Sequence, residues 1–170
     1  IFWDGRNLKG AVSLPEEIRV VAGGAFYGNR LLTEIRFPGH VTWIGGAALK
    51  GCTNLRRIVW PKAVTTAEPE VFSGCIRLET IELCPGSAEI KKPEFLSAEA
   101  VPWKAVKDRA FYNCRKLSGI LWGDIRTVGK EAFSGCAALG LGEAHSLEWA
   151  GELAFEGMGG MDAAGAAEGG

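Results

Sequence analysis

Apolar positions recur along this chain with one fixed period. Residues 38–60 read PGHVTWIGGAALKGCTNLRRIVW and residues 61–83 read PKAVTTAEPEVFSGCIRLETIEL. The two segments align without a gap and share Pro, Val, Gly, Cys, Leu and Ile at matching positions, which gives a repeat of 23 residues. A period of roughly 20 to 50 residues is typical of solenoids, whose units bury their apolar faces only by stacking on one another. The pattern therefore predicts a repeat solenoid.

A column of large apolar residues marks the copies of the repeat. It consists of Trp3, Phe26, Leu49, Phe72, Phe95, Phe111, Phe133 and Phe155. The step is 23 residues up to Phe95, then 16, and then 22 twice. We expect a solenoid of about seven repeats over residues 1–157, irregular over 84–100, and a low-complexity Gly/Ala tail over 158–170 that buries too little surface to fold. Because Phe95 keeps its position, the core is expected to continue through the irregular stretch.

Alternation between apolar and polar residues predicts where the strands lie. Residues 33–37, 56–60, 79–83 and 118–122 alternate with a period of two, which is typical of a strand with one buried face. We expect these strands to be parallel and adjacent in one sheet. A second short extended segment, such as VTWI, precedes each GGAF-like stretch, which is expected to form a short helical or 3₁₀ turn closed by glycine.

The combined pattern LxxIxxPxxVxxIGxxAFxGCxxL resembles the BspA-like class of leucine-rich repeats, which occurs in bacterial surface antigens and many protist proteins. The resemblance covers about residues 3–158. It implies an α/β or β-rich repeat solenoid, a right-handed coil with one parallel β-sheet face. It brings no catalytic motif. No polar cap is apparent at either end, so we expect the ends to be covered by a partner or by more of the same chain.

Composition adds few constraints. Nineteen basic and twenty acidic residues leave a formal net charge of -1, which argues against a nucleic-acid partner. No apolar run reaches the roughly 18 residues of a membrane span, and the first residues lack a signal-peptide layout. Unpaired cysteines and the lack of an Asn-x-Ser/Thr sequon favour an intracellular or organellar location, and the cell surface stays open as an alternative.

The cysteines and histidines indicate no catalytic or metal site. Four cysteines share one repeat position, namely Cys52, Cys75, Cys114 and Cys136, so the repeat explains their spacing. We expect them to be buried, reduced and without metal. Cys84 lies outside that position and is interpreted as inert packing. No phosphate-binding loop or nucleophile motif accompanies His40 or His145. We therefore expect no enzyme activity and no cofactor.

The outward positions of the predicted sheet are the first candidate binding residues. They are Glu34, Arg36, Arg57, Val59, Thr80, Glu82, Leu121 and Leu141. Matching positions on neighbouring strands form rows, because the strands lie about 4.8 Å apart. Val59, Leu121 and Leu141 are apolar where a polar residue would be tolerated, which favours a binding face over a merely solvated one.

Two tryptophans and one irregular stretch complete the candidates. Trp43 and Trp149 share a column that accepts Thr and Glu elsewhere, so they either contact a partner or cover gaps beside Ala67 and Ala150. The irregular stretch carries Lys91 and Lys92. We expect it to project as an exposed loop that contacts a partner, and a decayed repeat without a role is the alternative.

The sequence thus predicts a non-enzymatic protein-binding or scaffold module. Two alternatives remain at this point: a structural subunit of a large multi-protein complex, possibly in an organellar membrane, and a cell-surface adhesin.

Overall fold

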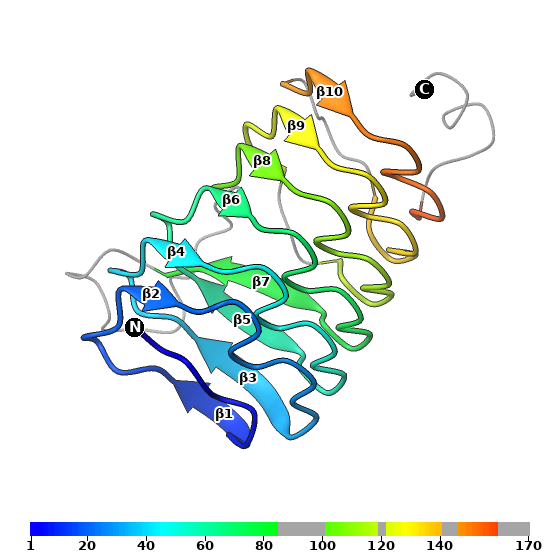
Figure 1. Cartoon of the computed structure of the whole chain (residues 1–170). Helices are drawn as coiled ribbons and strands as arrows, with labels where there is room; N and C mark the ends of the chain where they lie inside the picture. The colour runs from blue at the N-terminus through cyan, green and yellow to red at the C-terminus, as the bar shows by residue number, and fades with distance from the viewer. Residues whose placement is uncertain (85–100, 119–121, 141–145, 160–170) are drawn as a thin grey trace.

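The structure is a computed structural model that describes residues 1–84, 101–118, 122–140 and 146–159. Within these residues the chain forms short parallel strands joined by turns, and it winds into a solenoid (Figure 1). We call each turn of the solenoid a rung and name it by its aromatic residue. The strands are β1 (Gly10–Ser13), β2 (Val20–Val21), β3 (Leu32–Arg36), β4 (Trp43–Ile44), β5 (Arg57–Trp60), β6 (Thr66–Ala67), β7 (Thr80–Leu83), β8 (Ala105–Val106), β9 (Thr127–Val128) and β10 (Trp149–Ala150).

One face of the solenoid is a parallel sheet of longer strands in the order β1-β3-β5-β7. Its register places Ile35 beside Ile58 and Ile58 beside Ile81. Residues at the same position of successive repeats are therefore neighbours in the sheet. The strands expected at 33–37, 56–60 and 79–83 are confirmed. The ladder continues beyond β7, because the backbone N–H of Ser118 donates to the carbonyl of Glu79 at 3.1 Å. Of the rest of the fourth expected strand, 118–122, residues 119–121 lie outside the described residues and Trp122 is not part of a strand.

A second column of two-residue strands runs beside this sheet (Figure 1). It comprises the pair β2-β4 and the parallel sheet β6-β8-β9-β10. In each strand the second residue points inward: Ile44 and Val106, for example, have 0% and 1% of their surface exposed. The expected second extended segment is therefore confirmed, although each strand is only two residues long.

The rung of Phe72 lies directly on the rung of Phe111. Thr66 and Ala67 pair with Ala105 and Val106, and the N–H of Phe72 donates to the carbonyl of Ala110 at 2.8 Å. The two phenylalanine rings stack with centroids 4.8 Å apart. In the described part of the chain Phe111 is therefore the next member of the column after Phe72. Residues 85–100, including Phe95, lie outside the described residues.

Stacked side chains fill the interior between the two strand columns. Phe111 and Phe133 lie parallel at 5.1 Å, and Phe133 and Phe155 at 6.1 Å. At the other end the ring of Phe2 stacks on Phe26 at 5.1 Å. Trp3, which the repeat pattern placed in this column, is 71% exposed. In the shorter first rung the backbone position of this column is taken by Gly5, whose N–H donates to the carbonyl of Ala25 as the N–H of Phe26 donates to that of Ala48. Phe2 pairs with Val21 of the short-strand column, and its ring lies close to Gly5.

The turns of successive rungs form a third side, the turn edge. Each turn places two residues in the left-handed region. The first set is Gly24, Ala47, Glu70, Arg109, Glu131 and Leu153, and the second is Gly28, Gly51, Gly74, Asn113, Gly135 and Gly157. Each such residue is third in a four-residue turn closed by a hydrogen bond, as from the N–H of Asn29 to the carbonyl of Phe26 at 3.0 Å. This is the geometry of type II β-turns. The expected helical or 3₁₀ turns are thus β-turns in the described part, because a right-handed helix has no place for the two left-handed residues of each turn.

The cysteine column ties neighbouring rungs together. Each thiol donates a hydrogen bond to the carbonyl of the preceding rung's aromatic-column residue, for example Cys75 Sγ to Leu49 O and Cys114 Sγ to Phe72 O, both at 3.1 Å. Burial raises the pKa of Cys52 and of Cys136 to about 12, and it raises the pKa of Cys75 and Cys114 well above the usual value. The prediction of buried, reduced thiols at these four positions is confirmed.

Asn29 takes the place of cysteine in the Phe26 rung. Its side-chain amide donates to the carbonyls of Gly5 and Leu8, both at 2.8 Å, and its oxygen accepts from the N–H groups of Leu31 and Leu32. The side chain is 1% exposed, so one buried amide holds the shortened first turn against the second rung.

Candidate binding surfaces

The outward face of the long sheet centres on Arg57. Its Nη1 lies 2.7 Å from Glu34 Oε1 on β3, and its Nη2 lies 2.5 Å from Glu82 Oε2 on β7. The row runs across three strands because Glu34, Arg57 and Thr80 are in register. Hydrogen bonding to Glu82 raises the pKa of Arg57 above its usual value. The sequence analysis placed these three charged residues on neighbouring strands of the outward face, and they do lie there. In the structure both glutamates form ion pairs with Arg57.

Val59 differs from its expected exposure. It lies outside the core cluster on the outward side of β5, yet only 2% of its surface is exposed. Its neighbours in register are Arg36 and Glu82, whose long side chains flank it on both sides. The prediction of an exposed apolar residue is therefore wrong for Val59. Leu121, Leu141, Lys91 and Lys92 lie outside the described residues.

The column of short strands presents the two predicted tryptophans to solvent. Trp43 is 44% exposed and Trp149 is 57% exposed. The positions between them carry small residues, Thr66, Ala105 and Thr127. Trp43 also lies close to Gly45, since a Cβ built on that glycine would come within 2.9 Å of the Trp43 ring. Trp43 thus covers a neighbouring glycine in part, whereas Trp149 projects more freely.

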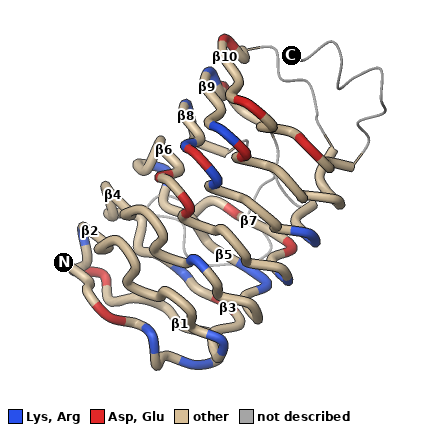
Figure 2. Tube along the Cα trace, turned by 45° about the vertical axis from the view of Figure 1, so that its right-hand side comes forward, with Lys and Arg blue, Asp and Glu red and all other residues tan. Residues whose placement is uncertain are grey.

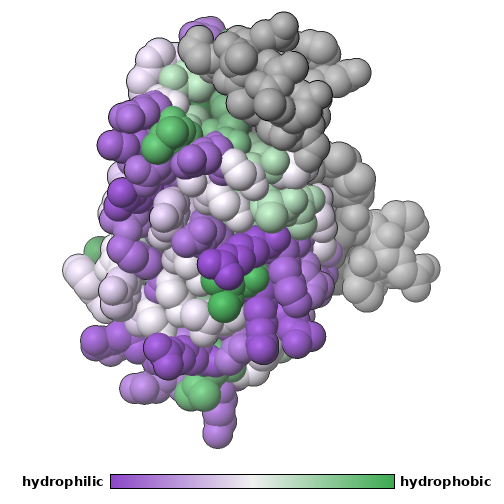
Figure 3. Space-filling view, turned by 90° about the vertical axis from the view of Figure 1, so that its right-hand side faces the viewer, coloured by the Kyte–Doolittle hydropathy of each residue, from purple (hydrophilic) through white to green (hydrophobic). Residues whose placement is uncertain are grey.

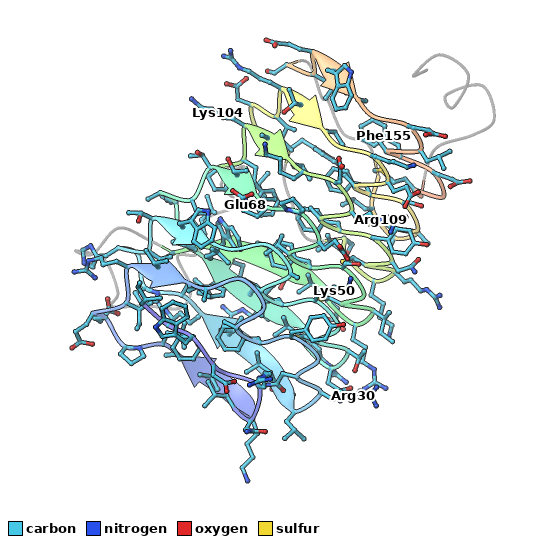
Figure 4. All side chains as sticks on the ribbon, in the orientation of Figure 1. Arg30, Lys50, Glu68, Lys104, Arg109 and Phe155 are labelled. Atoms are coloured by element: carbon cyan, nitrogen blue, oxygen red, sulfur yellow. The ribbon has the colours of Figure 1, made fainter. Side chains whose placement is uncertain are left out.

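The turn edge carries a charge ladder that the sequence reasoning missed. Its members are Lys50, Glu70, Asp108, Arg109, Lys130, Glu131 and Glu152. Lys50 pairs with Glu70, Arg109 Nε lies 2.5 Å from Glu131 Oε2, and Lys130 Nζ lies 3.6 Å from Glu152 Oε2. Figure 4 labels Lys50 and Arg109 on this edge, with the Phe72 rung between their two rungs. The sequence does contain a signal for this ladder, because Glu70, Arg109 and Glu131 occupy the same position in successive repeats with alternating charge.

Most charged side chains of the charge ladder form ion pairs with other members of the ladder. The hydrogen bond from Arg109 lowers the pKa of Glu131, and Arg109 also lies 5.5 Å from the ring centre of Tyr112. A shallow open depression lies among Pro69, Glu70, Asp108, Arg109 and Lys130. Because its charged groups face one another, this depression offers no unmet charge to a ligand.

The described part of the chain shows no constellation for metal binding or membrane insertion. Among those residues no three His, Cys, Asp or Glu side chains are placed to hold a metal ion. They also include no helix long and apolar enough for a membrane crossing. The chemistry that the described surfaces support is recognition by charge and by aromatic contact.

Comparison with known proteins agrees with this architecture. The family model of the BspA type leucine-rich repeat region matches in six copies over residues 2–101 and 103–162. No curated protein matches the sequence.

Among solved structures, a leucine-rich cell surface protein from Faecalibacterium prausnitzii is similar, with 23% identity and a TM-score of 0.62 over 89% of this chain. A leucine-rich repeat protein from Eubacterium ventriosum is 23% identical, with a TM-score of 0.64 over 88% of this chain. One from Bacteroides ovatus is 21% identical, with a TM-score of 0.54 over 92%. The matched regions cover only 36%, 43% and 51% of those three chains, so this chain spans about half of their length or less.

Proposed function

The chain belongs to the BspA-type leucine-rich repeat family, and we propose that it is a protein-binding module rather than an enzyme. The rungs form a rigid stack, because backbone hydrogen bonds join each rung to the next on all three sides. Such a stack holds side chains of successive rungs in straight rows, which suits recognition of an extended or broad partner surface.

The exposed tryptophans are the observation that carries this proposal. Exposed tryptophan is unusual on a soluble surface, and tryptophan is enriched among the residues that dominate protein–protein binding energy. Trp43 and Trp149 lie on one column, four rungs apart, which corresponds to roughly 19 Å at the usual strand spacing. The small residues between them leave room for a partner's side chains to approach the column. We therefore assign the column of short strands as the main contact face.

Other predicted residues would supply the rim of the interface. Glu34, Arg57 and Glu82 form an already paired cluster, so they would contribute orientation rather than much affinity. The stretch 85–100, with Lys91 and Lys92, lies in the sequence between two rungs that pair directly. We propose that this stretch contacts the same partner.

Two settings are candidates for this binding. Exposed apolar residues on the first rung, Ile1 at 64% and Trp3 at 71%, favour a subunit held within a larger assembly. The Faecalibacterium structure is named a cell surface protein, and an adhesin at a cell surface is the corresponding alternative. Light scattering on the purified chain separates the two, because a subunit with uncovered apolar residues would associate whereas an independent module stays monomeric.

Cross-linking tests the contact face. The chain is incubated with extract from its source cells, cross-linked, and the linked peptides are identified by mass spectrometry. The double variant Trp43→Ser/Trp149→Ser should lose the partner. A matched control replaces two exposed apolar residues of the turn edge, Tyr27→Ser/Leu153→Ser, and should retain it. Both variants are first checked for an unchanged circular dichroism spectrum. Equal partner capture by all three proteins would contradict the assigned face.

A further inference from the structure

Positive charge is concentrated on the side of the solenoid where each turn leads into the long sheet. The buried leucine column, Leu32, Leu55, Leu78 and Leu117, marks this boundary. Positions within two residues of these leucines carry Arg30, Arg56, Arg77, Arg115 and Lys116. Lys9 joins them from the first rung, because the next residue, Gly10, donates its N–H to the carbonyl of Leu31 at 2.9 Å. We call these six residues the basic edge.

Backbone pairing makes the basic edge continuous in space. The N–H of Arg56 donates to the carbonyl of Thr33 at 2.8 Å, and the N–H of Glu79 donates to the carbonyl of Arg56 at 2.9 Å. The ladder then reaches Ser118, two residues after Lys116. With about 4.8 Å between rungs, the edge extends over roughly 19 Å from Lys9 to Lys116. Figure 2 shows the blue segments following one another from rung to rung along this side.

The charges of the basic edge are unmatched, in contrast to those of the turn edge. All six side chains are exposed, and none forms an ion pair within the described residues. Arg77 donates instead to the neutral Asn54 Oδ1 at 2.8 Å. Glu79 is the one carboxylate at these positions in the described part of the chain. A row of like charges repels itself, so the edge maintains a positive potential that an anionic partner would relieve.

Apolar residues lie among these cations. Leu31 is 56% exposed and Ile76 is 37% exposed, and each occupies a position that carries Arg or Lys in other rungs. Figure 3, which faces this side of the molecule, shows separate hydrophobic side chains surrounded by hydrophilic ones. A phosphate backbone has no apolar side chains with which to contact Leu31 and Ile76, whereas a polypeptide can offer acidic and apolar side chains together.

We propose that the basic edge binds an acidic polypeptide segment that also carries apolar side chains. This inference rests on the proposed protein-binding function and names the chemistry of one partner segment. An extended peptide advances about 3.3 Å per residue, so some six residues would cover the edge from Lys9 to Lys116. The carboxylates would lie against the arginines and lysines, and the apolar side chains against Leu31 and Ile76.

Fluorescence anisotropy with a defined probe tests the proposal. The probe is a labelled twelve-residue peptide of Asp, Glu and Leu, titrated with the full chain at low and at physiological salt. The variant Arg30→Glu/Arg77→Glu/Lys116→Glu should bind it at least about tenfold more weakly. The matched control reverses three exposed cations elsewhere, Arg19→Glu/Lys104→Glu/Lys107→Glu, and changes the net charge equally. It should bind within about twofold of the unmodified chain. Thermal melts confirm that both variants fold.

A second arm separates peptide from nucleic acid. Leu31→Ser/Ile76→Ser should weaken peptide binding and leave any binding of a labelled twenty-nucleotide oligothymidylate unchanged. Equal weakening by the two charge-reversal variants would mean diffuse attraction and would overturn the proposal, as would tighter binding of the oligonucleotide than of the peptide. If the cell-extract partner is still captured by the charge-reversed edge variant, the proposed function stands and the assignment to the basic edge alone fails.

Discussion

Phe72 and Phe111 stack with ring centroids 4.8 Å apart and planes inclined by 29°, although residues 73–110 separate them in the chain. The intervening strand β7 belongs to the Phe72 rung, and the chain re-enters the stack near Val101 and Trp103, both buried. Two rungs that are unusually far apart in the sequence therefore pair as directly as any others.

Deleting residues 85–100 should leave the solenoid folded. The deletion shortens the separation between Phe72 and Phe111 from 39 to 23 residues, which is the ordinary repeat, and joins Cys84 directly to Val101. Four positions then separate Leu83 from Trp103, as from Trp60 to Val64. We expect cooperative urea unfolding with a midpoint equal to or slightly above that of the full chain, because a shorter loop loses less entropy on closure. A molten or unfolded deletion variant would contradict the direct stacking.

The same variant separates the two roles of the stretch. If residues 85–100 contact a partner, the folded deletion variant should bind that partner more weakly in the cross-linking experiment. Undiminished binding would favour a decayed repeat without a role.

Much of this architecture could be predicted because each repeat position occurs several times in the sequence, so that every copy supports the same structural interpretation. Ile35, Ile58 and Ile81 recur at one spacing, and the structure places them side by side in one parallel sheet. The buried thiols followed from the same logic, since Cys52 and Cys75 occupy one slot in two units. Exposure of Trp43 and Trp149 was predicted from the polar residues that replace them in other rungs.

The errors lie where a rung departs from its copies. The 23-residue spacing did not indicate that the Phe72 rung pairs with residues 105 and 106, which lie further along the chain than one repeat. Strand β1 was missed because the first rung is shortened, although Val12 lies one period before Ile35. Net charge gave no hint of the basic edge, because a total of -1 hides the separation of paired charges on one side from unpaired ones on another.

Truncation of Phe72 should be costly. The Phe72 ring is fully buried and contacts Trp60 at 5.3 Å as well as Phe111. We expect Phe72→Ala to reduce the free energy of unfolding by about 3–5 kcal/mol through the cavity it leaves. Cys75→Ala removes one sulfur and a weak hydrogen bond, so its cost should be clearly smaller, about 1 kcal/mol. Urea titration of both variants gives the comparison, and equal costs would contradict the central place of the aromatic column.

The buried thiols predict how stability depends on pH. In the folded chain the pKa of Cys52 and Cys136 is about 12, compared with 9.0 for the exposed group. Because the folded pKa is raised, the stabilisation is complete below pH 9 and is lost as the pH rises from about 9 towards 12, where only the unfolded chain releases the protons. The slope is at most about 1.4 kcal/mol per pH unit for each thiol.

Urea midpoints between pH 8 and pH 10.5 provide the measurement. The variant Cys52→Ala/Cys136→Ala should show a shallower decline than the unmodified chain. Identical slopes would show that these thiols do not contribute.

Two substitutions at left-handed residues should have opposite effects. Leu153 is exposed at φ 57° and Gly74 lies at φ 75°. A side chain costs about 1 kcal/mol in this conformation, so Leu153→Gly should be neutral or stabilising, and Gly74→Ala should destabilise by about 1 kcal/mol. Thermal melts measured side by side are sufficient, and a stabilising Gly74→Ala would contradict the type II turns.

Asn29 should not be replaceable by the cysteine that other rungs carry. Its amide makes four hydrogen bonds, two as donor and two as acceptor, and a thiol can donate only one. We expect Asn29→Cys to destabilise the chain by about 2 kcal/mol or more, since buried backbone groups would lose their partners. Hydrogen exchange should show the loss first at Leu31 and Leu32, and uniform exchange across all rungs would argue against a local role.

The charge ladder of the turn edge bears on how faithfully the chain folds. The core columns are so alike that a rung could stack on the wrong neighbour with little loss of apolar contact. The signs of the ladder alternate from rung to rung, so such an error brings like charges together. If the Phe72 rung skipped its neighbour and met the Phe133 rung, Glu70 would face Glu131. If the Phe111 rung met the Phe155 rung, Asp108 would face Glu152. We therefore expect the ladder to disfavour skipped rungs while the solenoid assembles.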